Sequence, residues 1–192
     1  MSVRRSCVLV LLLSLLGQAA AAQYAQRHEG LYASVGIGYG SADLSCDQCG
    51  DISREGDLTG FLNVGGALSQ AFLLGLEVTG WSKITSSNDD RSMGTVNGVV
   101  TWYPSPREGF FIKAGAGWGF LYGDQATQSA GIVSLSESGV GYQIGFGYDI
   151  RLQRDLSVTA VASLYGANVG SVGSINGVTF NVLQFMGAVT FH

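Results

Sequence analysis

The sequence predicts an all-β protein: an eight-stranded antiparallel transmembrane β-barrel preceded by a cleavable signal peptide. Three observations predict this fold class. Apolar residues recur at every second position through most of the chain, charged residues avoid those positions, and an apolar leader precedes the first alternating stretch. Because successive side chains of a strand point to opposite faces, each stretch has one apolar face and one small or polar face. An apolar outside and a polar, glycine-rich inside are typical of a small transmembrane barrel.

The leader comes first along the chain. Arg4 and Arg5 precede a short apolar run, Val8 to Leu16, and Ala22 ends a cluster of small residues suited to signal cleavage. The run is too short to cross a bilayer as a helix, which needs about 20 residues. We therefore expect a signal peptide over residues 1–22, with cleavage after Ala22, a periplasmic N-terminal segment over residues 23–30, and an outer-membrane barrel over residues 31–192.

Eight stretches after the leader carry the alternation. In the first, Val35 is assigned to the outer face and Ser34 to the inner face, and in the third Phe72 is outward and Glu77 inward. The stretches are long enough to cross the hydrocarbon as tilted strands of about 9–11 residues. The expected strands are, in order, Leu31–Ser41, Asp57–Leu68, Phe72–Lys83, Met93–Tyr103, Gly109–Leu121, Gly139–Ile150, Asp155–Gly166 and Val178–Phe191.

The later strands show the pattern most clearly. The apolar face of the fifth strand carries Ile112, Ala114, Ala116, Trp118 and Phe120, and that of the sixth carries Val140, Tyr142, Ile144, Phe146 and Tyr148. Four glycines lie opposite the apolar face in the sixth strand: Gly139, Gly141, Gly145 and Gly147. Small residues on the inner face have a plain use, because large side chains on every strand would not fit inside a narrow barrel.

Connections between the strands alternate in length. The long ones are expected at Ala42–Gly56, Tyr122–Ser138 and Ala167–Gly177, whereas Ser69–Ala71 and Arg151–Arg154 are tight. Outer-membrane barrels have short periplasmic turns and longer external loops. An even number of strands then places both chain ends in the periplasm and every long connection outside.

Charged and aromatic residues test the same assignment of faces. Six charges within the expected strands all have the inward parity: Asp57, Glu77, Lys83, Lys113, Asp149 and Asp155. Two groups of outward aromatics would form belts at the membrane boundaries: Phe72, Trp102, Phe110, Tyr148 and Phe191 near the periplasm, and Tyr39, Trp118, Phe120 and Tyr142 near the outside.

With the leader, the strand count and the rhythm of the loops, the chain resembles the small outer-membrane β-barrel families, namely the opacity-type surface antigens and the barrel domain of major outer-membrane proteins. The resemblance covers Leu31 to the end of the chain. In these families the last strand ends in an aromatic residue that the barrel-assembly machinery reads. Phe191 matches this aromatic, although His192 follows it. The resemblance therefore implies the cell outer membrane as the location and the assembly machinery as a partner.

The cysteines of Cys46-Asp47-Gln48-Cys49 are the sharpest local signal. A redox dithiol would normally begin a helix in a thioredoxin-like unit, and a metal site would need more soft ligands than the nearby aspartates provide. We expect instead a local disulfide between Cys46 and Cys49 in an external loop, formed in an oxidising compartment. No metal and no cofactor are expected.

Glu77 and Lys113 are inward charges at similar depth, on strands separated by one neighbour. We expect them to form an ion pair across the lumen, the interior space of the barrel, although a gate or proton relay is the functional alternative. An eight-stranded interior is just wide enough for side chains to fill. Further inward side chains of large volume, Phe61, Trp81, Phe111 and Tyr165, would help to block it.

Catalysis has little support in the sequence. The two histidines are His28, before the first expected strand, and His192, the last residue. Without a histidine on a strand, Ser134, Ser136 and Ser138 are interpreted as loop serines. Loss of Arg4 and Arg5 with the leader changes the formal net charge from −4 to −6, which argues against nucleic acid as a partner.

The expected function is therefore non-enzymatic: a structural or surface-interaction role through four external loops. The expected partners are outer-membrane lipid and lipopolysaccharide, with a possible external or host ligand. Two other functions remain open, a narrow channel or carrier of a small apolar molecule and, less favoured, a lipid-modifying barrel enzyme. A soluble lipocalin-like barrel is the alternative fold, against which the charge-free outer face argues.

Overall fold

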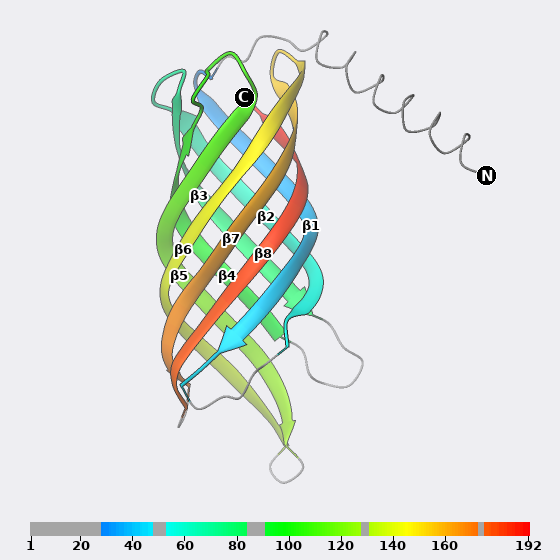
Figure 1. Cartoon of the computed structure of the whole chain (residues 1–192), viewed down its shortest axis with the longest axis vertical. Coiled ribbons are helices and arrows are strands. Elements are labelled where there is room, and N and C mark those ends of the chain that lie inside the picture. The colour runs from blue at the N-terminus through cyan, green and yellow to red at the C-terminus, as the bar shows by residue number, and fades with distance from the viewer. Residues whose placement is uncertain (1–27, 48–52, 84–90, 128–130, 173–174) are drawn as a thin grey trace, which may run out of the picture.

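A computed structural model describes residues 28–47, 53–83, 91–127, 131–172 and 175–192. Eight antiparallel strands form one closed barrel in chain order, and β8 pairs with β1 (Figure 1). The strands are β1 (Leu31–Ser45), β2 (Glu55–Ala67), β3 (Phe72–Lys83), β4 (Arg91–Trp102), β5 (Phe110–Thr127), β6 (Gly131–Gln153), β7 (Leu156–Val172) and β8 (Ile175–Phe191). The predicted fold class is confirmed. The leader and its cleavage site at Ala22 lie outside the described residues.

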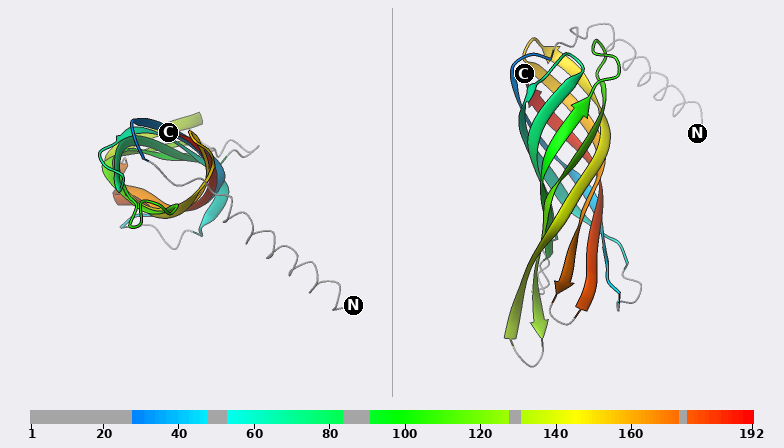
Figure 2. Two further views of the ribbon diagram at one scale, coloured as in Figure 1. Left: turned by 90° about the horizontal axis from the view of Figure 1, so that it is seen from above. Right: turned by 90° about the vertical axis from the view of Figure 1, so that its left-hand side faces the viewer.

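The two ends of the barrel differ. The C-terminus and the connections β2–β3, β4–β5 and β6–β7 lie at the upper end in Figure 1, which we call the turn end. The opposite end, where the β5–β6 and β7–β8 hairpins project, is the hairpin end (Figure 2). In the part of the chain that the structure describes, no α-helix has the length and hydropathy that a membrane-spanning helix requires.

Three strand pairs are longer than the sequence predicts. The stretch Tyr122–Ser138, expected as a long loop, is mostly hairpin, because β5 and β6 stay paired as far as Thr127 and Gly131. Likewise β7 and β8 continue through most of Ala167–Gly177, and β1 reaches Ser45. Backbone hydrogen bonding between these strands continues beyond the residues that alternate in hydropathy. Alternation therefore predicts only the membrane-crossing part of each strand and not the part that extends beyond the membrane.

The faces of the strands follow the predicted parity. Outward residues such as Val35, Ile144 and Val158 are exposed, whereas Ser34 and Gln143 on the opposite parity are buried. Five of the six charges assigned to the interior keep that parity, but Asp155 lies in the exposed β6–β7 turn, because β7 begins one residue later, at Leu156. The outer surface is therefore apolar over the middle of the barrel wall.

Outward tyrosines lie across glycines of the neighbouring strands at the hairpin end. The Tyr142 hydroxyl donates to Asn181 Oδ1 across the intervening Gly166. A Cβ on Gly166 would lie against that hydroxyl, and a Cβ on Gly56 would overlap the hydroxyl of Tyr39. Each glycine thus leaves room for a ring to lie along the wall, at the level where aromatic residues are expected to meet the membrane boundary.

The lumen is filled in layers. A hydrophobic cluster lies in the turn-end half and a second in the hairpin-end half, with polar side chains between them. The turn-end cluster comprises Tyr32, Phe61, Leu73, Tyr103, Phe111, Val161, Met186 and Ala188. The hairpin-end cluster comprises Ala42, Trp81, Met93, Tyr165, Ala167, Val169, Val178, Phe180 and Val182. The inward aromatics that the sequence singled out, Phe61, Trp81, Phe111 and Tyr165, are all buried here.

Replacing an outward apolar residue with arginine should test the wall assignment. Ile144→Arg places a charge in the middle of the apolar face of β6 and should cost about 2–4 kcal/mol of folding free energy. The measurement is urea unfolding in lipid vesicles. Leu152→Arg, an outward substitution at the turn end, is the control, with an expected cost of about 0–1 kcal/mol. Equal losses for the two variants would contradict the assignment.

Substitution of two glycines with opposite parity should test the packing of the lumen. A Cβ on Gly119 of β5 would overlap the Cβ of Ala167 on β7, two strands away, whereas a Cβ on the outward Gly80 meets nothing within 4 Å. Gly119→Val should therefore destabilise the barrel by about 1–3 kcal/mol through overpacking. Gly80→Val should be neutral or stabilising, because valine favours strands. The same unfolding measurement compares the two variants. An unchanged free energy of unfolding in Gly119→Val would show that β5 and β7 do not approach each other at this position.

Candidate functional site

The Glu77 side chain accepts five hydrogen bonds inside the lumen. Its carboxylate accepts from Lys113 Nζ at 2.7 Å to Oε1 and 2.9 Å to Oε2. Three neutral groups also donate to it: Asn63 Nδ2 at 2.8 Å, Thr79 Oγ1 at 3.2 Å and Gln143 Nε2. The donors come from β2, β3, β5 and β6, so one carboxylate ties half of the barrel wall together.

Lys113 is enclosed as completely as its partner. Glu77 is 0% and Lys113 3% exposed, and the Lys113 ammonium lies 4.6 Å from the centre of the Phe61 ring. A cation over an aromatic face is attracted by the negative face of the ring. Removal of two charges from water is costly, and it is offset only when geometry is good and the remaining hydrogen bonds are satisfied. The Glu77 environment meets both conditions.

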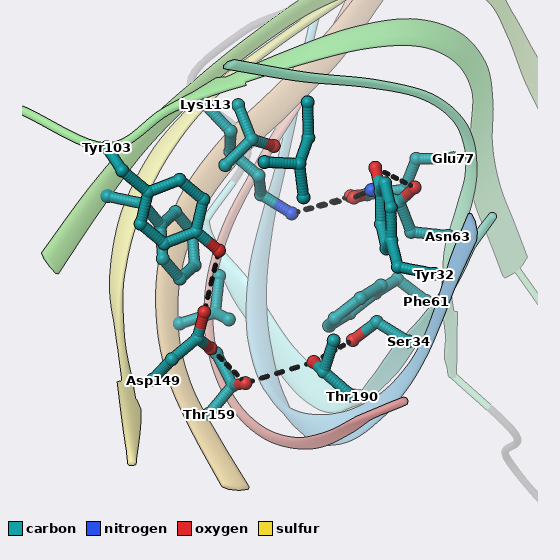
Figure 3. Close-up of a pocket in the computed structure, with 14 residues that line it drawn as sticks. Tyr32, Ser34, Phe61, Asn63, Glu77, Tyr103, Lys113, Asp149, Thr159 and Thr190 are labelled. Atoms are coloured by element: carbon teal, nitrogen blue, oxygen red, sulfur yellow. Dashed lines mark hydrogen bonds and ion pairs between the residues drawn. The ribbon is translucent and has the colours of Figure 1, made fainter. Parts of the chain in front are cut away.

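A second polar group lies nearer the turn end and surrounds Asp149. Tyr103 donates to Asp149 Oδ2 at 2.6 Å, and Thr159 donates to Oδ1 (Figure 3). The chain continues from Thr159 through Thr190 to Ser34, with oxygen–oxygen distances of 3.1 Å and 2.8 Å. A cavity of about 40 Å³ separates this group from the Glu77–Lys113 pair. The cavity has both polar and apolar side chains in its lining, and its size suits a few water molecules beside the polar ones, since a single water needs about 10–15 Å³.

Residues just outside the strands close the turn end. His28 is 2% exposed, and its Nδ1 lies 3.0 Å from the carbonyl oxygen of Gln70. Its ring stacks on Tyr103 with 3.9 Å between centroids and meets His192 edge-on at 5.7 Å. His192 Nε2 in turn lies 3.2 Å from Ser157 Oγ. Burial and the nearby Arg151 lower the pKa of His192 to about 4, and burial lowers that of His28 as well.

Charges at the hairpin end are paired with one another. Glu55 accepts from Lys83 Nζ at 2.7 Å and faces an Arg91 nitrogen at 3.7 Å. Arg54 lies 3.7 Å from Asp43. These groups are partly exposed, so each pair contributes little to stability.

The cysteines lie at the same end. Cys46 is disulfide-bonded and packs against the hairpin-end cluster, and the backbone N–H of Asp47 donates to the Asn176 carbonyl at 3.2 Å. Cys49 lies outside the described residues, so the pairing of Cys46 with Cys49 stays a prediction. At the opposite end, Phe191 is outward and exposed, and the His192 N–H extends the β7–β8 pairing by donating to the Asp155 carbonyl at 3.0 Å. A role for Phe191 in assembly also stays a prediction.

Sequence reasoning placed Glu77 and Lys113 in the lumen at similar depth, and the structure brings them into contact. It missed the groups around the two histidines. His28 precedes the first strand and His192 follows the last, so neither carries a parity that would indicate burial. Ser157 and Asp149 do carry the inward parity, and that signal could have marked the turn end as a polar cluster. Among the described residues, no group of three or more His, Cys, Asp or Glu side chains is arranged to hold a metal ion.

Comparisons with known proteins agree with this geometry. A family model described as the outer membrane protein beta-barrel domain matches residues 8–191. The structure is similar to that of Ail, the attachment invasion locus protein of Yersinia pestis, which was solved in complex with the heparin analogue sucrose octasulfate. The two sequences are 14% identical and the TM-score is 0.61. The match covers 85% of this chain and 99% of the Ail chain. It is also similar to Neisserial surface protein A, at 12% identity and a TM-score of 0.56, covering 84% and 96% of the two chains. No curated protein sequence matches the chain.

A double-mutant cycle should test the Glu77–Lys113 pair. Glu77→Ala and Lys113→Ala should each cost about 3–5 kcal/mol, because each leaves an uncompensated buried charge. The double variant should cost clearly less than the sum of the two. The measurement is the free energy of unfolding in a denaturant series in vesicles. Thr101→Ala, which lines the same cavity, is the matched control for lost volume, and additive losses would show that the pair does not interact.

Proposed function

We propose that this chain, which belongs to the family of outer membrane protein beta-barrel domains, uses its barrel as an anchor and its hairpin end as a surface for interaction outside the cell. The chain lies in the outer membrane. Short turns of such barrels face the periplasm and longer connections face outward, so the turn end is periplasmic and the hairpin end external. The observation that carries the proposal is the projecting β5–β6 hairpin.

One edge of that hairpin is available for pairing. Pairing between β6 and β7 ends at Val140 and Asn168. Just beyond this point β7 has a bulge, and Gly170 has a φ of 77°. Beyond it, the two hairpins separate (Figure 2). Residues 131–139 of β6 pair with β5 on one side, and among the described residues they have no strand partner on the other.

The edge lacks the features with which proteins protect exposed strands. Its sequence, Gly131 to Gly139, holds neither lysine nor proline and a single charge, Glu137. Exposed strand edges are normally blunted by such residues, and an edge without them accepts an added strand. The cations described at this end are already matched by Glu55 and Asp43. We therefore propose an extended polypeptide, rather than a polyanion, as the external ligand.

The filled lumen supports an anchor over a channel. The Glu77–Lys113 pair and the hairpin-end cluster lie one above the other, and the cavity near the pair measures about 40 Å³. A non-enzymatic role is also part of the proposal. The one described contact of a histidine with a serine hydroxyl, His192 with Ser157, lies inside the turn end, where Ser157 is 0% exposed and out of reach of lipid.

Lipid of the outer membrane, including lipopolysaccharide, is the proposed surrounding of the apolar wall. The barrel-assembly machinery is the proposed partner during insertion. The external ligand would then meet only the projecting hairpins.

Shortening the hairpin should separate anchoring from interaction. A variant that joins the paired residues Tyr122 and Ser136 through a two-residue turn should still fold, because the shortened part lies beyond the membrane-crossing pairs. In bacteria that display the protein, adhesion to epithelial monolayers should fall about tenfold, the loss expected for about 1.4 kcal/mol of binding free energy. A length-matched control replaces residues 131–137 with alternating glycine and serine. Its adhesion should fall equally if the strand edge is what the ligand recognises.

Unchanged adhesion in both variants would overturn the proposal. A steady current through the unaltered protein in a planar bilayer would move the interpretation to a pore. We expect no such current, because side chains fill the lumen.

A further inference from the structure

We propose that the segment His28–Gly30 is an acid-sensitive plug: it is seated in the turn-end mouth of the barrel while the His28 imidazole is neutral, and it is released into the periplasm when that imidazole is protonated. The proposal does not depend on the external role of the hairpins. It rests on how His28 is held and on which groups surround it.

The seat of His28 is built from four elements that meet only at the mouth. The β2–β3 turn supplies Gln70, whose carbonyl lies 3.0 Å from His28 Nδ1 and whose Oε1 accepts the His28 backbone N–H at 3.1 Å. The residue after β4 supplies the Tyr103 ring, and the end of β8 supplies His192. One further backbone bond, from the Ala67 N–H to the Gly30 carbonyl at 2.9 Å, holds the same segment. Tyr103 also lines the internal cavity, and His28 stacks on the Tyr103 ring. His28 and Tyr103 thus lie between the cavity and the turn-end opening of the barrel.

Hydrogen bonding in the seat fits a neutral ring. With Nδ1–H donating to the Gln70 carbonyl, Nε2 keeps a lone pair, and this buried atom has no hydrogen-bond partner among the residues that the structure describes. Protonation would put an N–H at Nε2, where no described group is positioned to accept it. A buried donor without an acceptor costs about as much as a lost hydrogen bond, and more when it is charged.

The charges that face His28 also oppose protonation. Arg151 of β6 and His192 after β8 are the potential cations nearby, and Arg151 lowers the pKa of both histidines. The acidic groups are Glu29 in the same segment, Asp149 deeper in β6 and Asp155 in the β6–β7 turn. Asp149 accepts from Tyr103 and Thr159, and Glu29 accepts from Gln70 at 3.3 Å, while Asp155 is exposed. The remaining titratable groups near His28 are the hydroxyls of Tyr103 and Tyr32. They stay neutral in the acidic range, so they do not change the charge around His28.

The direction of the pH effect follows from the lowered pKa values. Above the ordinary histidine pKa of about 6.5, the seated and released segments are both neutral and the seat is fully stable. As the pH falls below that value, the released segment binds protons and the seated segment does not, so the seated state becomes less stable relative to the released one. The loss continues down to the lowered pKa of the seated rings, which for His192 is about 4. Acid therefore opens the plug, and return to neutral pH closes it.

Proton NMR of the processed protein in lipid nanodiscs provides the test, because the chain has only two histidines. At pH 7.5 the Tyr103 ring should shift the His28 imidazole signals strongly upfield, since the rings are stacked at 3.9 Å. Between pH 6.5 and 4 those signals should move to the positions of a free histidinium. Over the same range, the protection factor of the Ala67 amide, which is the exchange rate of an unstructured amide at the same pH divided by its own, should fall at least tenfold, whereas the Asn97 amide in mid-barrel β4 should stay protected.

Two variants separate the plug from a general loss of folding. His28→Phe keeps a stacking ring but removes the titration, so the Ala67 amide should remain protected at pH 4. Arg151→Gln removes a facing cation and should raise the pH at which His28 titrates. Two outcomes would overturn the proposal: a His28 that titrates while keeping its upfield shift, or an Ala67 amide that loses protection at acid pH in His28→Phe as it does in the unaltered protein.

Discussion

Closure of a narrow ring of strands is the constraint on which the rest of the structure depends. In an apolar medium every backbone N–H and C=O must be paired within the protein, and a sheet satisfies this only when its last strand pairs with its first. Here β8 pairs with β1 from Ala33–Phe191 to Ser45–Thr179. With eight strands the enclosed space is no wider than its side chains, so inward residues form a packed core instead of lining a pore.

Most strands of the barrel supply polar residues as well as apolar ones to this core. The hydrogen bonds of Glu77 reach four strands, and those around Asp149 link Tyr103 to β6 and β7 and, through Thr190, to β8 and β1. Neighbouring strands already share backbone hydrogen bonds, so side-chain bonds across the bore join walls that the backbone does not. The apolar cluster at the hairpin end does the same through packing, where β5 approaches β7 at Gly119 and Ala167. Polar and apolar layers thus fix the cross-section of the barrel together.

Much of this could be predicted from the sequence, because two physical rules act on every crossing strand. Alternation predicted which residues face outward, and the cost of a charge in lipid predicted that Glu77 and Lys113 share the lumen. Neither rule applies beyond the membrane. The extension of β5 and β6 toward Thr127 and Gly131 carries no alternation that lipid enforces, so it was interpreted as a loop. The seat of His28 depends on contacts between the chain ends and a turn, which no local pattern records.

The position of the projecting hairpin in the order of strands has a mechanical consequence. Strands β5 and β6 lie away from the β1–β8 seam, and each is paired along its membrane-crossing length with a further strand, β4 or β7. A pull on the hairpin tip acts nearly parallel to these strands, so the flanking backbone hydrogen bonds resist together in shear instead of opening one after another. The apolar wall adds resistance, since extraction would draw charged turns such as Arg151–Arg154 through lipid. A cell held by this hairpin would be tethered through the backbone hydrogen bonds on both sides of it.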